Sequence, residues 1–131
     1  MQEKHLFEYA VIRIVPRVER EEFINIGVIL YCATQNFLHC QFQIDEPRLL
    51  SFANHIDMDE LKPRLLAFEQ ICSGSPAGGP IGRLPIGSRF RWLTSKRSTV
   101  IQLSPVHPGL CSSADETLLK LHDQLVKCEL I

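Results

Sequence analysis

The sequence predicts a single α+β domain over residues 1–131, in which an antiparallel sheet of four to five strands packs against two or three helices on one face. The length fits one domain, and 45% hydrophobic and 22% charged residues are typical of a globular protein. Three β-branched, apolar segments follow one another near the N-terminus. Later segments repeat apolar residues at helical spacing.

The first expected strand covers residues 6–15 and ends before Pro16. It is rich in aromatic and β-branched residues, and Arg13 interrupts it. Because apolar residues fall on both faces of this segment, we expect a strand that is central in the sheet or covered on both sides.

The second and third strands are expected over residues 23–32 and 37–44, on either side of a short turn. Gly27 lies inside the second strand, where a glycine marks a bulge or a close backbone approach. Asn25 belongs to the same bulge, or it places a buried amide at a site. The third segment alternates apolar and polar residues, which indicates a half-buried strand. The short connections predict an antiparallel three-stranded meander.

The middle of the chain is predicted to be helical. Asp45 is a capping residue for a short helix that has Pro47 in its first turn. Asp57 or Asp59 caps a second helix that ends near residue 72. Pro63 is unfavourable inside that helix, so the helix either starts close to Asp59 or is kinked.

Glycine and proline dominate residues 73–87, and this composition predicts a flexible loop without regular structure. The loop is either a flap over a site or an ordinary surface loop.

The last third of the chain is less regular. Residues 88–94 fit either a helical turn or a strand, whereas residues 98–103 indicate a strand. Residues 104–113 are expected to form a rigid loop that prolines punctuate. Asp115 is the expected cap of a last helix. Its buried stripe would comprise Leu118, Leu121, Leu125 and Val126.

The segment from residue 89 to residue 99 is the most unusual part of the chain, because it combines four cations with the only tryptophan. Arginines so close together repel one another, and an anion, a partner carboxylate or a phosphate would explain their clustering. The alternative is a solvated cationic face that pairs with acids such as Glu22. Lys96 is one of the four cations, and the candidate binding residues in this segment are Arg89, Arg91, Trp92, Arg97, Ser98 and Thr99.

His107 is a second candidate, because Pro105 and Pro108 restrict the backbone around it. It is suited to act as a general base or as a phosphate ligand. Alternatively, its ring hydrogen-bonds a backbone carbonyl and holds the loop in place.

Charge and cysteine content exclude several functional classes. The net charge of -1 gives no general attraction to nucleic acid, so a basic site has to be local. The five cysteines form no C-x-x-C pair and match no zinc spacing, so we expect reduced thiols and neither a metal nor a cofactor. Cys32 and Cys40 lie in apolar runs, which predicts burial. Without a signal peptide or a membrane-spanning segment, we expect a cytoplasmic protein.

Several segments together resemble the bacterial family called domain of unknown function 3037. This family has no established activity to carry over. Some members are encoded beside a protein that resembles the HipA-type kinases, so the resemblance implies a bacterial origin and a kinase-like partner. The chain departs from the usual pattern at Ser95 and Lys96, where a small residue and a proline are common. The matching segments are residues 9–13, 22–30, 89–93, 97–99 and 107–109.

Two functional hypotheses follow. The first is a non-catalytic binding or accessory protein, whose basic and aromatic surface docks an acidic or phosphorylated partner. The alternative is an enzyme acting on a phosphorylated or nucleotide substrate, in which arginines clamp the phosphate and His107 is the acid or base. Convergence of Arg89, Arg91, Arg97 and His107 in one concave pocket would favour the enzyme.

Overall fold

The computed structural model describes residues 3–97 and 99–127, which form one α+β domain with five antiparallel strands. The predicted fold class is therefore confirmed. The strands are β1 (His5–Ile14), β2 (Ile24–Cys32), β3 (Phe37–Phe42), β4 (Ile101–Leu103) and β5 (His107–Cys111). The helices are α1 (Glu46–Phe52), α2 (Met58–Ser73), α3 (Gly79–Gly82), α4 (Ile86–Leu93) and α5 (Ala114–Leu125), with 3₁₀ turns η1 (Val18–Arg20) and η2 (Pro76–Gly78).

The sheet has the order β3-β2-β1, and β4 and β5 share the remaining edge of β1. The meander β1-β2-β3 is confirmed. Along β1, β5 pairs with the first half of the strand and β4 pairs with the second half. Ser104 joins the two, because its hydroxyl accepts a hydrogen bond from the Val11 amide at 2.8 Å and its own amide donates to the Val11 carbonyl.

The prediction of a loop over residues 104–113 is wrong, because β5 lies within it. Two residues that usually oppose strand formation are accommodated at this edge. Pro108 is tolerated since an edge strand does not need every amide. Gly109 lies beneath Phe7, and a Cβ atom on the glycine would lie 2.5 Å from the Phe7 ring. The aromatic ring thus fills the space above the glycine.

The predicted bulge in β2 is confirmed. Ile12 pairs with Gly27 and Arg13 pairs with Asn25, so Ile26 is the extra residue. Gly27 is required by close packing, because an added Cβ would lie 2.7 Å from the Gln41 carbonyl oxygen. The Asn25 side chain donates to the Leu125 carbonyl at 3.1 Å, which ties the bulge to the end of α5.

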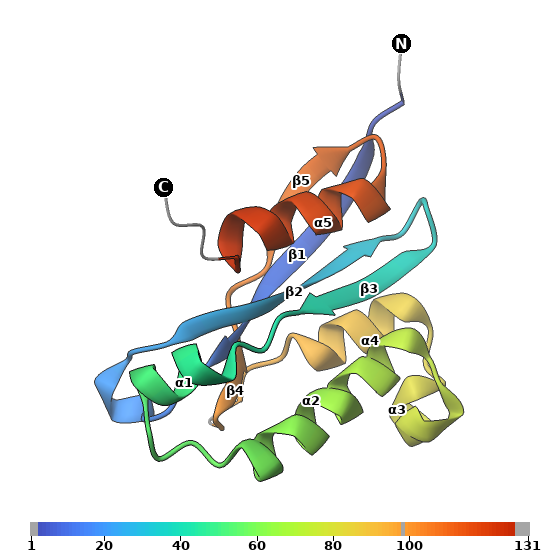
Figure 1. Cartoon of the computed structure of the whole chain (residues 1–131). Helices are drawn as coiled ribbons and strands as arrows, with labels where there is room; N and C mark the ends of the chain where they lie inside the picture. The colour runs from blue at the N-terminus through green and yellow to red at the C-terminus, as the bar shows by residue number, and fades with distance from the viewer. Residues whose placement is uncertain (1–2, 98, 128–131) are drawn as a thin grey trace.

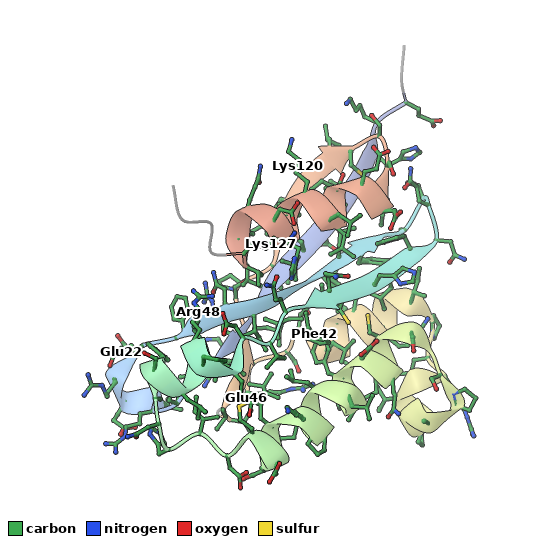
Figure 2. The ribbon with its side chains drawn as sticks, viewed as in Figure 1. Glu22, Phe42, Glu46, Arg48, Lys120 and Lys127 are labelled. Atoms are coloured by element: carbon green, nitrogen blue, oxygen red, sulfur yellow. The ribbon has the colours of Figure 1, made fainter. Side chains whose placement is uncertain are left out.

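Helices cover both faces of the sheet, and not one face as predicted (Figure 1). One core lies between the sheet and the helices α2 and α4, and it includes Ile12, Leu65 and Phe90. The second core lies under α5, where Leu118 packs with Val28 and other apolar residues. Lys120 on α5 and Lys127 just after its end lie on that side of the sheet (Figure 2). The second layer follows from the apolar residues that β1 and β2 carry on both faces.

The predicted helix starts are largely confirmed. Asp45 and Asp57 cap α1 and α2, and their carboxylates accept hydrogen bonds from amides of the first turn. Pro63 lies inside α2 without ending it. For α5, the expected cap is wrong: Ser113 is the capping residue, and Asp115 lies in the first turn.

Residues 73–87 are more regular than predicted. They contain the 3₁₀ turn η2 and the short helix α3, because Pro76 and Pro80 begin helical turns well. Residues 88–94 are helical, since α4 extends from Ile86 to Leu93. The strand expected over residues 98–103 is shorter and begins at Ile101.

We expect Gly27→Ala to destabilise the domain by about 1–3 kcal/mol, because the new methyl group would overlap a fixed carbonyl in β3. Gly82→Ala is the matched control, since its Cβ would lie no closer than 3.4 Å to any neighbour and its backbone dihedrals suit alanine. The control should be neutral or stabilising by up to about 1 kcal/mol. Urea denaturation of both variants tests this, and equal midpoints would contradict it.

Candidate functional site: the basic and aromatic surface

The helix α4 determines where the predicted arginines lie. Phe90 and Leu93 are fully buried at a spacing of three residues, so they fix the inner face of this helix. Arg89, Arg91 and Trp92 consequently lie on its flanks and outer face, where each contacts a different part of the molecule.

Arg89 has a structural role. Its guanidinium donates to the carbonyl oxygens of Ile71 and Cys72 at 3.3 and 3.2 Å. These carbonyls belong to the last turn of α2, where intrahelical partners are missing and a positive charge is favourable. Arg89 therefore connects α4 to the end of α2 through its Nη1 group.

Arg91 is neutralised within the chain. Its guanidinium lies 2.7 Å from the carboxylate of Glu8 on β1. The acid is not Glu22 or one of its neighbours in the β1–β2 connection, which the sequence suggested. The pair is partly solvated, with 59% of the Arg91 side chain exposed, so it contributes little to stability.

Arg97 and Trp92 form the part of the predicted surface whose positive charge is not paired with a carboxylate of the described residues. The guanidinium carbon of Arg97 lies 4.4 Å from the centre of the Trp92 ring, and the same group donates to the Trp92 carbonyl at 2.8 Å. Burial lowers the pKa of Arg97 from its ordinary value, but a guanidinium stays charged in proteins. Among the described residues, neither Arg97 nor Lys96 has a carboxylate partner.

Two hollows adjoin Arg97. One, of about 290 Å³, lies between α2, α4 and the start of β4, and its lining includes Arg64, Trp92 and Thr99. The other, also of about 290 Å³, is lined by Lys96, Arg97, Gln102 and Leu103. We call the set Arg64, Trp92, Lys96, Arg97 and Thr99 the Arg97 surface.

Two members of the Arg97 surface differ from the sequence prediction. Arg64 was missed because it follows Glu60 by four residues, a spacing that is typical of an ion pair on an exposed helix face. The two side chains do form this pair, at 2.8 Å. Thr99 donates its hydroxyl proton to the Ile101 carbonyl, so this proton is already used within the fold. Ser98 lies outside the described residues.

His107 lies on the other face of the sheet. It is the register partner of Tyr9, and the two rings are 5.3 Å apart. Tyr9 packs against the core beneath α5, whereas Phe90 of α4 stacks on Tyr31 and belongs to the opposite core. An arginine clamp with His107 as its base is therefore not assembled in the described part of the chain.

The described cysteines form no candidate metal site. Within residues 3–97 and 99–127, no three histidine, cysteine or acidic side chains lie close enough to hold a metal ion. Cys32 is fully buried, as predicted, whereas Cys40 is half-buried. A hydrogen bond with Cys72 and burial raise the pKa of Cys40, and burial raises the pKa of Cys111. These thiols are therefore poor nucleophiles.

The comparisons with known proteins identify the family. The family model described as protein of unknown function (DUF3037) matches residues 9–126, so this small α+β domain belongs to that family. The resemblance seen in the sequence is thus confirmed. Neither a curated protein nor a solved structure matches the chain. In the described residues, no helix has the length and apolar character needed to cross a membrane.

Arg89→Ala should destabilise the domain by about 1–3 kcal/mol, because two carbonyls at the end of α2 lose a charged donor. Arg91→Ala is the control on the same helix, and losing its solvated ion pair should cost at most about 1 kcal/mol. Thermal melts of both variants measure the difference. A larger loss for Arg91→Ala would show that these roles are assigned wrongly.

The thiols of the native protein should react slowly with a chromogenic thiol reagent at pH 8. Burial and raised pKa values keep Cys40 and Cys111 protonated there, and Cys32 is inaccessible. The measurement uses a Cys128→Ser background, because Cys128 lies outside the described residues. In denaturant, all four remaining thiols should be labelled rapidly. Rapid labelling without denaturant would contradict the predicted burial.

Proposed function

We propose that this protein is a non-catalytic binding or accessory protein, and that its Arg97 surface docks an acidic or phosphorylated segment of a partner protein. The observation that carries the proposal is the state of Arg97. Its guanidinium is held in place by the Trp92 ring and carbonyl, and none of the described carboxylates neutralises it.

The arrangement favours anion binding for two physical reasons. A guanidinium that is already positioned loses little conformational freedom when it binds a carboxylate or phosphate. Partial desolvation beside an aromatic ring also strengthens its interaction with an incoming anion. Phe68 and Ile71 line the neighbouring hollow and provide apolar surface next to the charge. Binding proteins commonly combine such an aromatic contact with an arginine.

The family resemblance suggests a candidate partner. A kinase-like protein of a bacterial cytoplasm, encoded beside members of this family, is the partner we propose to test first. Nucleic acid is a poorer candidate, because the net charge of -1 provides no extended positive field. Since His107 lies on the other side of the sheet and Arg91 is paired with Glu8, the binding function is favoured over the enzyme.

Trp92 provides a direct test, because it is the only tryptophan in the chain and its side chain is 40% exposed. Its fluorescence should change when a phosphothreonine peptide or a glutamate-rich peptide is titrated into the protein. Arg97→Ala should weaken binding by roughly tenfold or more, as expected for the loss of a charge-assisted hydrogen bond of about 1.4–3 kcal/mol. Added salt should weaken wild-type binding more than variant binding.

The control for this titration is Arg48→Ala. Arg48 is also exposed, but it lines neither hollow of the Arg97 surface. This variant should bind the peptides as the wild type does. The proposal fails if neither peptide changes Trp92 fluorescence, or if Arg97→Ala and Arg48→Ala bind equally well.

A further inference from the structure

The hollow beside Trp92 is one member of a connected series. At the far end, a hollow of about 440 Å³ lies between η1 and the end of α1, and Arg17 and Arg20 contribute to its lining. Pro16 and His55 line both this hollow and a smaller one of about 140 Å³. Arg64 then links the small hollow to the one beside Trp92. The four hollows therefore form a series in which neighbours share lining residues, and we call this series the groove; its two middle members lie along α2.

Charge is distributed unevenly along this groove. Five cations and three carboxylates line the four hollows. Glu22 is paired with Arg20, Glu60 is paired with Arg64, and Asp57 caps α2. Glu22 lies in the β1–β2 connection at one end of the molecule (Figure 2). The positive charge that remains is therefore concentrated at the two ends of the groove.

The end charges come from separate segments. Among the described residues, Arg17 has no carboxylate partner at one end, and Lys96 and Arg97 have none at the other. The middle of the groove combines apolar side chains with the mutually paired Glu60 and Arg64 and with Asp57, which caps α2. Ile56 and Val100 line its small hollow. A ligand that complements the groove thus carries an anion at each end and apolar groups between them.

The length of the groove defines the ligand further. The lining of the two middle hollows along α2 extends from Asp57 to Ile71, which corresponds to about 20 Å at ~1.5 Å per helical residue and sets the scale of the separation between the charged ends. An extended peptide covers that distance with about six residues at ~3.3 Å each. A helical ligand would need about 13 residues to reach both ends.

We infer that the groove binds an extended segment of a partner protein, with acidic or phosphorylated residues about six positions apart and apolar side chains between them. The inference rests on the proposed function at the Arg97 end and adds a second contact at Arg17. The chemistry required is an anion at each end, and either a carboxylate or a phosphate supplies it.

The test compares three synthetic peptides by Trp92 fluorescence. One carries a pair of glutamates at one end only. The second carries such pairs at both ends, about six residues apart, and the third places the pairs about two residues apart. We expect the widely spaced peptide to bind at least about tenfold more tightly than the others, because both ends engage at once.

Arg17→Ala should abolish this gain and leave the affinity for the one-ended peptide unchanged. Arg48→Ala is the matched control, since it removes the same charge from an exposed site that lines none of the four hollows. Figure 2 shows Arg48 on α1. This control variant should bind all three peptides as the wild type does. Repeating the series with phosphothreonine in place of each glutamate pair compares carboxylate with phosphate as the anion.

The possible failures are distinguishable. If the one-ended and widely spaced peptides bind equally and Arg97→Ala weakens both, the groove inference is wrong and the proposed function stands. If the widely spaced peptide shows no gain, a fourth peptide with the glutamate pairs about 13 residues apart is titrated; tight binding of this peptide with helical circular dichroism would show that the extended conformation is wrong. If no peptide changes the fluorescence, both the inference and the proposed function fail.

Discussion

β1 and β2 carry apolar side chains on both of their faces, and the need to bury both faces decides where the helices lie. α2 and α4 cover one face, and α5 covers the other. The same division separates the candidate functional residues. Arg91 and Arg97 belong to the side of α4, whereas His107 extends from β5 toward the side of α5. Residues that are close in the sequence thus lie on opposite sides of the sheet.

Three arginines within nine residues have three different roles, and their partners explain the difference. Arg89 donates to two carbonyls in the last turn of α2, so its charge serves the fold. Arg91 meets a carboxylate in a solvated pair. Arg97 has an aromatic ring and a carbonyl as neighbours, which orient the guanidinium but leave its charge uncompensated. Clustering alone therefore does not identify a binding residue; the chemistry of the partners does.

Local features were predictable from the sequence, and features that depend on distant contacts were not. The caps Asp45 and Asp57 and the bulge at Gly27 follow from the preferences of single residues and short patterns. β5 was missed because Pro108 and Gly109 oppose strand formation, and only the Phe7 ring and the edge position make it possible. Arg64 was missed for a related reason: its neighbour Arg97 is distant in sequence, so no local pattern links them.

The sheet edge and the proposed groove depend on each other. Ser104 binds the Val11 backbone at the point along β1 where pairing with β4 ends and pairing with β5 begins. The short segment that carries Arg97 and Thr99 leads into β4 and is positioned by it. One wall of the groove is therefore attached to the central strand of the sheet, while α2 forms the other wall. Because both walls pack on the same core, the separation of the two walls is set by the fold itself. A groove with a charge at each end selects ligands by the distance between their anions, which a single charged surface does not do.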